Sequence, residues 1–555
     1  MSVQSLVDQA RLLAGIPQEI GRSEYPSINA LLAAAVLRYG PSPALSALGH
    51  TMDFQTLDRL SAAFASWLQR HTDLQPGDRI AIQLPNLLQY PVVFLGALRA
   101  GLVVVNTNPL YTAREMEHQF LDSGAKALVV LANMASVAQT VIPKTGIRHV
   151  VVTELADLHP QPLRSLINLA ARYVKKLVPT WHIPGAVPLR RALQMGAAAP
   201  HREAAPVASD LAVLQYTGGT TGVSKGAMLS HGNVVANVQQ SASLFVTYDF
   251  HDGAERLLLP LPLYHIYAFN ACLGMISRGC HTVLVPNPRD LASVVKAFRR
   301  YRPTGFAGLN TLFVALCNDE AFCALDFSEL KLTMSGGMAL TMAAAERWRQ
   351  VTGVEIVEGY GMTETSPVIS VNPVNANRLG TIGVAVPSTG VRILDDEGRE
   401  LSAGEPGELV VRGPQVMQGY WQRPDETAKV LDADGWLCTG DIALVTPEGY
   451  LRIVDRKKDM IVVSGFNVYP NEIEDVVAAH PGVLECAAVG VPDERSGESV
   501  RVFVVRRDPA LSEDALRQHC RANLTGYKMP RQFIFRDSLP KSNVGKILRR
   551  ELRDS

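Results

Sequence analysis

Helix-like and strand-like patterns alternate along residues 1–200, and this alternation constrains the fold more than any other feature of the chain. A helical spacing of apolar residues over 57–70 precedes a strand-like run at 79–84, and a second helical pattern at 92–100 precedes a strand-like run at 102–105. Such alternation predicts layered α/β structure in which helices join parallel strands. No repeat with a fixed period is visible, which argues against solenoids and propellers.

Size and composition indicate a globular protein of more than one domain. The 555 residues provide ample apolar material, and Lys+Arg and Asp+Glu both number 53, so no net charge attracts nucleic acid and any anion site must be built locally. The seven cysteines are scattered without C-x-x-C spacing, which is typical of a reducing cytosol and argues against a disulfide framework or a zinc site. Asp8, Arg11 and Glu19 interrupt the N-terminus, so it lacks the apolar core of a secretory signal. We expect a soluble, cytoplasmic protein.

The sequence pattern changes after residue 383. Short β-rich runs at 390–394 and 407–412 alternate with Gly, Pro and Asp turns and predict a small antiparallel β unit. A densely charged run at 452–459 follows, which is typical of a solvated β-hairpin as well as of a hinge. The predicted organisation is a large N-terminal domain of layered α/β subdomains plus the β unit at 1–455, a hinge at 456–460 and a small mobile α+β domain at 461–555.

The most distinctive segment is 216–227, which reads Tyr-Thr-Gly-Gly-Thr-Thr-Gly-Val-Ser-Lys-Gly-Ala. Glycine lets backbone amides approach a ligand closely, while the hydroxyls and the lysine add donors and positive charge. The segment therefore predicts a polyphosphate site, with a flexible surface turn as the alternative. The residues predicted to bind nucleotide are Tyr216, Thr217, Gly218, Gly219, Thr220, Thr221, Gly222, Val223, Ser224, Lys225, Gly226 and Ala227.

This loop is not a Walker A motif. That motif needs Lys and Ser or Thr directly after its second glycine, whereas Gly222 is followed by Val223. An apolar run at 211–214 precedes the loop, and the pattern after Gly226 is helical. We therefore predict a strand–loop–helix arrangement, in which backbone amides and the helix dipole favour an anion.

Four further residues carry candidate chemistry, although each has a structural explanation when taken alone. Glu364 offers a hard carboxylate oxygen of the kind that Mg²⁺ prefers, but an isolated glutamate is usually a surface residue. Asp441 lies in a tight turn where it can accept both ribose hydroxyls or form an Asx-type turn. His265 lies among apolar residues and Lys546 in a glycine-containing turn; such residues are usually structural and solvated, respectively.

Residues 163–178 have apolar side chains at helical spacing, with Arg164, Arg172, Lys175 and Lys176 on the other faces. A basic amphipathic helix can lie on an anionic membrane surface, but it more often packs on the core of its own protein. Both alternatives remain open at this point.

Together and in this order, these segments resemble the core motifs of the acyl-adenylate-forming superfamily, which includes acyl-CoA synthetases, firefly luciferases and peptide-synthetase adenylation domains. The resemblance covers nearly the whole chain. It is most similar to bacterial long-chain fatty-acid–CoA ligases at Pro85-Asn-Leu-Leu-Gln-Tyr-Pro, Asn108-Pro-Leu-Tyr, Leu261-Pro-Leu-Tyr-His-Ile, Asp455-Arg-Lys-Lys-Asp-Met-Ile and Ser464-Gly-Phe-Asn-Val-Tyr-Pro-Asn-Glu-Ile-Glu.

The resemblance implies a nucleotide site. The loop at 216–227 would hold the β- and γ-phosphates of ATP. The adenine would be framed by Gly336, Gly337 and Tyr360, and the ribose would be bound by Asp441 and Arg456.

The resemblance also implies the residues of the chemical step. Thr363 would contact the α-phosphate, Glu364 would hold Mg²⁺, and Lys546 would bridge the attacking carboxylate and the nucleotide. Because this step brings two anions together, both positive charges are needed to offset repulsion.

A second step would use another surface. In the family the C-terminal domain swings about a hinge residue, here Lys458, which removes the adenylation lysine and brings the turn of Ser464 and Gly465 to the pantetheine tunnel. His265 would be a gate near the thiol and not a general base. Gly308 would leave an acyl tunnel open for a long chain.

The implied activity is that of a long-chain fatty-acid–CoA ligase, which forms acyl-AMP from a fatty acid and MgATP and then acyl-CoA, feeding fatty-acid degradation. Its partners would be long-chain fatty acid, ATP and CoA, with no nucleic acid; peripheral contact with the inner membrane and a homodimer are open hypotheses. The alternatives are a ligase for medium-chain or aromatic acids and a catalytically silent acyl-nucleotide-binding protein. Intact Glu364, Asp441, Arg456 and Lys546 argue against the silent protein.

Overall fold

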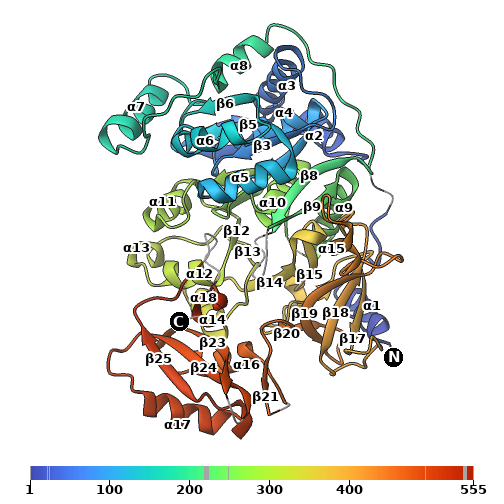
Figure 1. Ribbon diagram of the computed structural model, residues 1–555, viewed down its shortest axis with the longest axis vertical. Coiled ribbons are helices and arrows are strands. Elements are labelled where there is room, and N and C mark those ends of the chain that lie inside the picture. The colour runs from blue at the N-terminus through green and yellow to red at the C-terminus, as the bar shows by residue number, and fades with distance from the viewer. Residues whose placement is uncertain are drawn as a thin grey trace.

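The computed structural model consists of two large α/β layers, a small β unit and a C-terminal α+β unit (Figure 1). It describes residues 2–21, 23, 25–217, 224–247, 249–464, 466–493, 496–541 and 547–553. The mixed α/β prediction with a large N-terminal part and a small C-terminal part is confirmed. No helix in these ranges is both long and apolar enough to cross a bilayer.

The first large sheet has seven strands in the order β7-β6-β5-β3-β4-β8-β9, and only β9 runs antiparallel to its neighbour. Its strands are β3 (Arg79–Gln83), β4 (Val103–Asn106), β5 (Ala125–Leu131), β6 (His149–Thr153), β7 (Val187–Pro188), β8 (Leu211–Thr217) and β9 (Lys225–Ser230). Its helices include α3 (Phe54–His71), α4 (Gln89–Arg99), α5 (Ala113–Ser123), α6 (Ala135–Val141) and α8 (Leu189–Gly196). The parallel strands with helical crossovers are those expected from the alternating pattern.

The second large sheet has nine strands in the order β16-β15-β14-β13-β12-β10-β11-β1-β2. They are β1 (Pro43–Ala47), β2 (His50–Asp53), β10 (Arg256–Leu259), β11 (His281–Leu284), β12 (Gly305–Gly308), β13 (Leu332–Ser335), β14 (Ile356–Gly361), β15 (Val368–Val371) and β16 (Val384–Ala385). The accompanying helices are α1 (Val3–Leu13), α2 (Ile28–Tyr39), α9 (His231–Leu244), α10 (Ile266–Ser277), α11 (Leu291–Tyr301), α12 (Asn310–Cys317), α13 (Glu320–Cys323) and α14 (Met342–Thr352). One continuous apolar core joins elements of both large sheets, so the two layers support each other.

The small β unit is an antiparallel sheet in the order β17-β18-β19-β20, as the sequence predicts. Its elements are β17 (Gly390–Leu394), β18 (Gly407–Arg412), α15 (Pro424–Ala428), β19 (Leu437–Val445) and β20 (Leu451–Arg456). The C-terminal unit has its own core and contains β21 (Ile461–Val463), β22 (Phe466–Val468), α16 (Pro470–Ala478), β23 (Val483–Asp493), β24 (Gly497–Arg506), α17 (Glu513–Asn523), β25 (Gln532–Arg536) and α18 (Arg549–Arg553). The exact boundaries at 455 and 461 stay a prediction.

The helix predicted after Gly226 is confirmed at 233–238, which lie in α9, and is wrong at Met228 and Leu229. Residues 225–230 form β9, which pairs antiparallel with β8, so the glycine-rich segment joins the two strands of a hairpin. The helix begins only at His231, where the Ser230 hydroxyl caps it by accepting from the Asn233 amide at 3.0 Å. Since no helix N-terminus follows the loop directly, the helix-dipole argument does not apply to it.

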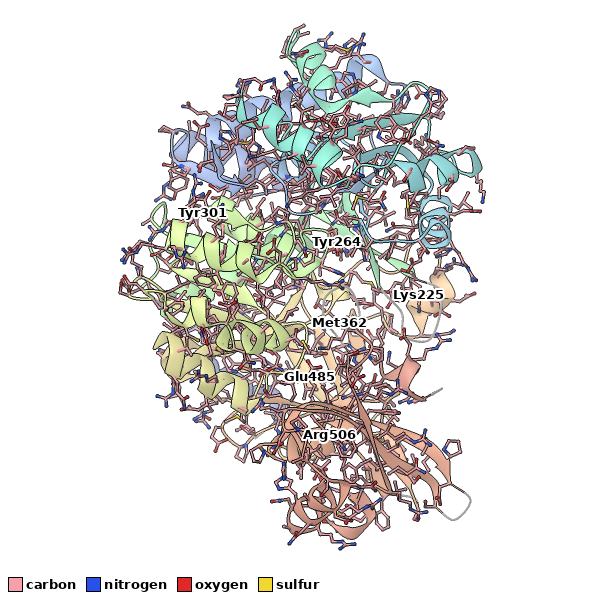
Figure 2. The ribbon with its side chains drawn as sticks, turned by 90° about the vertical axis from the view of Figure 1, so that its left-hand side faces the viewer. Lys225, Tyr264, Tyr301, Met362, Glu485 and Arg506 are labelled. Atoms are coloured by element: carbon pink, nitrogen blue, oxygen red, sulfur yellow. The ribbon has the colours of Figure 1, made fainter. Side chains whose placement is uncertain are left out.

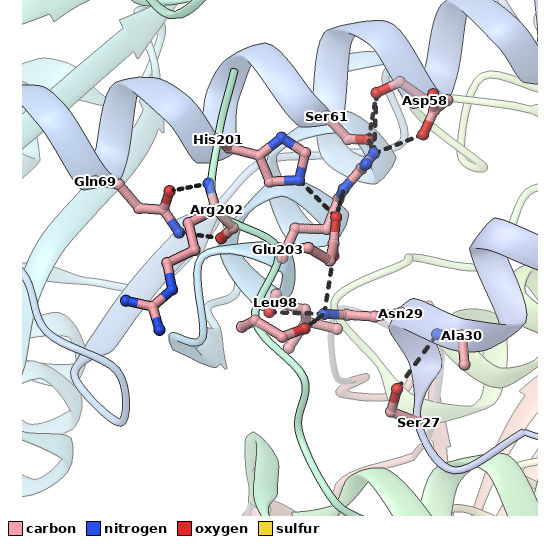
Figure 3. A network of polar contacts seen from close by, with 12 residues as sticks. Ser27, Asn29, Ala30, Asp58, Ser61, Gln69, Leu98, His201, Arg202 and Glu203 are labelled. Carbon is pink, nitrogen blue, oxygen red and sulfur yellow. Dashed lines mark hydrogen bonds and ion pairs between the residues drawn. The ribbon is translucent and has the colours of Figure 1, made fainter. Parts of the chain in front are cut away.

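A polar network fixes the extended chain that leads into β8 (Figure 3). His201 and Asn29 both bond Glu203, at 2.5 and 3.3 Å, and Glu203 also pairs with Arg99 at 3.0 Å. Arg99 in turn donates to Asp58 at 2.7 Å. The segment is thereby tied to α2, α3 and α4, which positions β8 and the loop that follows it.

The amphipathic segment contacts the core of the protein only through part of its length, since Ala171 is buried and Val178 packs against the core of the first sheet. Its first part forms α7 (Leu163–Leu169), which has no buried residue and projects from the side of the first sheet (Figure 1). Its exposed apolar side chains are Leu163, Leu166, Leu169, Tyr173, Val174 and Leu177. Packing on the core of the protein therefore accounts for Ala171 and Val178 but leaves the apolar side chains of α7 exposed.

Candidate active site

The described ends of the glycine-rich loop are held together across the β8–β9 hairpin. The Ser224 hydroxyl donates to the Thr217 carbonyl at 2.6 Å, and the Thr217 hydroxyl donates to the Lys225 carbonyl at 3.5 Å. Opposite each other in the ladder are Tyr216 and Gly226, and a Cβ on Gly226 would lie 3.1 Å from the tyrosine ring. The six residues predicted to contact phosphate between these ends lie outside the described residues: Gly218, Gly219, Thr220, Thr221, Gly222 and Val223.

The hydroxyl of Tyr216 is directed away from the loop. It donates to Asp122 at 2.7 Å, and Asp122 also pairs with Arg423 at 2.7 Å. The hydroxyls of Thr217 and Ser224, at the two described ends of the loop, are likewise engaged in hydrogen bonds to backbone carbonyls. The only loop side chain in the described part that offers a positive charge to a phosphate is therefore that of Lys225.

Lys225 is the start of a chain of contacts that reaches Glu364. Its ammonium forms an ion pair with Glu426 at 2.7 Å and lies 4.6 Å from the centroid of the Tyr420 ring. The Tyr420 hydroxyl donates to Oε1 of Glu364 at 2.7 Å. Figure 2 shows Lys225 and Met362 in the middle of the molecule, above the C-terminal unit. A loop lysine and the predicted metal ligand are thus brought together through one side chain.

Glu364 lies in a short 3-10 helix, Thr363–Thr365, directly after β14. Its side chain is buried at 7% exposure, and the burial raises its pKa, while the hydrogen bond from Tyr420 acts in the opposite direction. No ion pair to this carboxylate is found among the described residues. A buried carboxylate with a neutral donor is an electrostatic site that favours an incoming cation.

The predicted adenine and ribose residues form a second group. Tyr360 at the end of β14 donates its hydroxyl to Asp441, and Asp441 pairs with Arg456 at 3.3 Å across the β19–β20 ladder. Gly336 and Gly337 follow β13, and the φ of +84° at Gly337 requires glycine. The structure therefore brings Tyr360, Asp441 and Arg456 into direct contact.

His265 directly precedes α10 without a capping hydrogen bond from its side chain, and it packs beside Tyr264 with ring centroids 4.7 Å apart. Burial lowers the pKa of its imidazole to about 4, so the ring is neutral at pH 7. A group that takes up a proton only near this pH is a weak base, which agrees with a gating role better than with general-base catalysis.

Gly308 lies at the end of β12 beside aromatic side chains. A Cβ at this position would lie 2.7 Å from the ring of Phe313 and 3.2 Å from that of Phe306, and Phe313 is fully buried. The space that the missing side chain provides is filled by these rings in the core beside β12. The glycine therefore allows close aromatic packing, and its role in an acyl tunnel stays a prediction.

The predicted hinge lies in the connection between β20 and β21. Lys458 is in the turn that follows β20. Just before it, the buried carboxylate of Asp455 accepts from the Asn471 amide at 2.8 Å in the first turn of α16 and lies 3.7 Å from Arg549. These contacts join the small β unit to the C-terminal unit.

The remaining predicted residues belong to the C-terminal unit. Ser464 adopts a left-handed conformation (φ 51°) in the turn after β21, and its amide donates to Ser496 at 2.7 Å. Gly465 and Lys546 lie outside the described residues. Lys541 and Ile547, the described residues on either side of the segment with Lys546, pair with each other.

Comparisons with known proteins agree with this arrangement. A family model described as AMP-binding enzyme matches residues 32–421, and one described as AMP-binding enzyme C-terminal domain matches 472–546. The chain belongs to the AMP-binding enzyme family.

Near full-length relatives and a solved structure show which members of the family this AMP-binding enzyme resembles. Proteins named long-chain-fatty-acid–CoA ligase from Escherichia coli O157:H7 and Salmonella typhi are each 52% identical to it over 98% of this chain and 97% of their own. The solved structure of an ATP-bound RpMatB–BxBclM chimera is 30% identical, with a TM-score of 0.82 over 95% of this chain and 98% of its own.

The carboxylate available in this AMP-binding enzyme fits a Mg²⁺ ion that binds together with a nucleotide. No group of three or more His, Cys, Asp or Glu side chains that could hold a metal by themselves is found in the described ranges. Mg²⁺ is usually held by one or two carboxylates together with substrate phosphates. The single buried carboxylate of Glu364 near Lys225 matches that requirement.

Sequence reasoning missed Tyr420 and Glu426. Tyr420 is separated from Glu364 by 56 positions, and Glu426 from Lys225 by 201. Neither lies in a segment whose composition suggests chemistry, since Gln-Gly-Tyr-Trp at 418–421 reads as an ordinary glycine turn beside aromatic residues. Only their contacts in the folded chain identify them.

Proposed function

We propose that this AMP-binding enzyme is an AMP-forming long-chain fatty-acid–CoA ligase. The observation that carries the proposal is the chain of contacts Lys225–Tyr420–Glu364 beside the group of Tyr360 and Asp441, which offers separate places for phosphates and for a nucleoside. The names of the relatives that are 52% identical over nearly the full length support the fatty acid as substrate.

The reaction has two steps. An oxygen of the fatty carboxylate attacks the α-phosphorus of ATP, the bond to the oxygen bridging to the β-phosphate breaks, and pyrophosphate leaves. The sulfur of CoA then attacks the carbonyl carbon of the resulting acyl-AMP anhydride, AMP leaves with the former carboxylate oxygen, and the thiol proton is released. Adenylation replaces a poor leaving group, the carboxylate oxygen, by a better one, AMP, which the thiol then displaces.

The proposed residue roles follow from charge and position. Lys225 and the remaining residues of 216–227 bind the β- and γ-phosphates, and Thr363 contacts the α-phosphate. Glu364 holds Mg²⁺, which when bound neutralises charge on the phosphate oxygens. Lys546 orients the attacking carboxylate against the nucleotide. The negative charge that develops in adenylation is thereby met by fixed positive groups.

The nucleoside would be bound by the second group of residues. Gly336, Gly337 and Tyr360 frame the adenine, because glycines allow a flat base to approach the backbone. Asp441 accepts from the ribose hydroxyls, and Arg456, already paired with it at 3.3 Å, holds the carboxylate in place.

The thioester step would use a second orientation of the C-terminal unit. We propose that the unit moves about Lys458 within 456–460, between an N-terminal domain at 1–455 and a C-terminal domain at 461–555. The turn of Ser464 and Gly465 then replaces Lys546 at the site and lines the path of the pantetheine. Neutral His265 gates that path.

The substrate assignment is tested by measuring CoA-thioester formation with ATP across fatty acids of rising length and one aromatic acid. We expect kcat/KM to rise with chain length and to be greatest for long chains, because each buried methylene contributes about 0.8 kcal/mol to binding. Activity confined to short, medium-chain or aromatic acids would overturn the long-chain assignment and leave the adenylate chemistry standing.

We also propose that the exposed segment at 163–178 lies on an anionic membrane surface. Leu166, Tyr173 and Val174 are 62%, 68% and 78% exposed, and basic side chains of the same segment lie beside them. Apolar side chains that enter the interface and basic side chains that meet anionic headgroups together favour such a contact. The enzyme would then take up its poorly water-soluble fatty acid from the membrane in which that substrate is dissolved.

The membrane proposal predicts weaker vesicle binding for Lys175→Glu combined with Lys176→Glu. Each basic residue near an anionic surface contributes about 1 kcal/mol, so we expect the partition coefficient on phosphatidylglycerol-containing vesicles to fall by about tenfold or more in co-sedimentation. The control, Lys296→Glu with Arg347→Glu on the exposed faces of α11 and α14, changes the net charge equally. Equal binding of both double variants and the unmodified enzyme would contradict the proposal. The homodimer hypothesis can be tested on the same samples by light scattering.

A further inference from the structure

We infer that Tyr420 is a positioning residue of the adenylation site, whose hydroxyl orients the Glu364 carboxylate while its ring supports the ammonium of Lys225. The inference rests on the proposed function, because it concerns the metal ligand and the phosphate-binding lysine of that site. It adds a residue that fixes these two groups relative to each other.

The backbone of Tyr420 is anchored to the strand that carries Lys225. The Trp421 amide donates to the Gly226 carbonyl at 2.8 Å, and the Met228 amide donates to the Gly419 carbonyl at 2.9 Å. Tyr420 itself forms a bridge with Ala227. The tyrosine therefore moves with β9 and not as an independent surface loop.

The same segment is anchored to the turn that carries Glu364. The Met417 amide donates to the Glu364 carbonyl at 2.8 Å, and the Tyr420 amide donates to the Thr427 hydroxyl at 2.9 Å in α15. Since residues on both sides of Tyr420 are bonded to different parts of the site, its backbone cannot shift without straining these bonds.

The side chain of Tyr420 makes two different interactions. Its hydroxyl, 2.7 Å from Oε1, is a donor to a buried carboxylate, and such outer contacts fix the direction in which a metal-binding carboxylate points. Its ring face, with the ammonium of Lys225 at 4.6 Å from the centroid, provides a cation–π contact that holds the lysine over the site. Tyr420 and Glu364 are both 7% exposed, so their hydrogen bond is shielded from bulk water, whereas the side chain of Lys225 is 31% exposed.

These two interactions can be separated by substitution. Tyr420→Phe removes the hydroxyl and keeps the ring. We therefore expect the affinity for Mn²⁺, measured by electron paramagnetic resonance in the presence of ATP, to fall about 10–100-fold. We expect ATP binding without a divalent ion, measured by calorimetry, to stay within about twofold, because the lysine keeps its aromatic support.

A leucine at the same position removes the ring as well. Compared with Tyr420→Phe, Tyr420→Leu is expected to weaken metal-free ATP binding by a factor of about two to five, because the partly exposed cation–π contact with Lys225 is lost. A general loss of folding would lower the affinities for Mn²⁺ and for metal-free ATP together. It would not lower the Mn²⁺ affinity alone in Tyr420→Phe and both affinities in Tyr420→Leu.

Tyr450→Phe is a closely matched control. Tyr450 is 4% exposed, donates its hydroxyl at 2.8 Å to the Ala376 carbonyl, and has the Arg378 guanidinium 4.4 Å from its ring centroid. Tyr450→Phe therefore removes a buried tyrosine hydroxyl and keeps a ring that contacts a cation, at a place where the protein has no proposed metal ligand. We expect Mn²⁺ and ATP affinities equal to those of the unmodified enzyme.

A double-mutant cycle provides a second measurement. In a Glu364→Gln background, Tyr420→Phe should no longer change Mn²⁺ affinity, because the carboxylate that the hydroxyl orients is absent. Full Mn²⁺ affinity in folded Tyr420→Phe, or equal losses in Tyr420→Phe and Tyr450→Phe, would overturn the inference while leaving the proposed function intact. Failure of the unmodified enzyme to bind Mn²⁺ with ATP would refute the proposed metal role and the inference together.

Discussion

Replacing Glu364 by glutamine is expected to lower the rate of fatty-acid-dependent pyrophosphate exchange by about 10²–10³-fold. Glutamine retains the volume and the acceptor oxygen for Tyr420, but it removes the charge that would hold Mg²⁺. The environment of this carboxylate is unusual, because Glu364 is only 7% exposed and has no ion pair among the described residues. The residue is therefore better suited to a ligand than to a structural ion pair.

The Glu364→Gln prediction includes a binding measurement. The variant should remain folded, with an unfolding temperature close to that of the unmodified enzyme, because a buried neutral amide costs no more than a buried carboxylate without a cation. Stabilisation by ATP should be the same for both proteins without divalent ions and should increase with Mg²⁺ only in the unmodified enzyme. An undiminished exchange rate, or equal Mg²⁺-dependent stabilisation of both proteins, would contradict the assigned role.

Lys546→Ala is expected to separate the two half-reactions. Pyrophosphate exchange should fall by about 10²–10³-fold, since a fixed positive charge at the attacking carboxylate is lost. Conversion of supplied acyl-AMP and CoA to thioester should stay within about threefold of the unmodified rate, because the lysine is proposed to leave the site before that step. Single-turnover thioester formation from synthetic acyl-AMP provides the measurement.

Lys541→Ala is the control for this prediction. Lys541 precedes the same turn, pairs with Glu485 at 2.5 Å on the surface and has no proposed role in the chemistry, so both half-reactions should remain normal. If a folded Lys546→Ala variant lost both half-reactions to the same extent, the proposed alternation of the C-terminal unit would be wrong.

Much of the fold is predictable because its signals are local. The expected strands at 390–394 and 407–412 coincide with β17 and β18, since β-rich runs bounded by turn residues contain their own start and stop signals. The parallel sheets follow from alternating helical and strand-like periods. The family likewise follows from short motifs, each of which is continuous in the chain.

The local signals fail where pairing partners decide the structure. Residues 225–230 have a pattern compatible with helix, yet they form β9 because β8 pairs with one edge and the segment around Tyr420 bonds the other. A neighbour distant in sequence thus overrides the preference of the segment.

The sequence by itself determined the α/β class, the family and the identities of Glu364, Asp441 and Arg456 as site candidates, because motif chemistry is encoded in adjacent residues. Only the tertiary structure decided that the glycine-rich loop closes a β-hairpin, that α7 is exposed, and that Tyr420 joins Lys225 to Glu364. The contacts around Tyr420 join segments far apart in the chain, since Tyr420 and Glu364 are separated by 56 positions and Lys225 and Glu426 by 201. Such contacts form only when the sheets pack, and no local pattern of residue types specifies them.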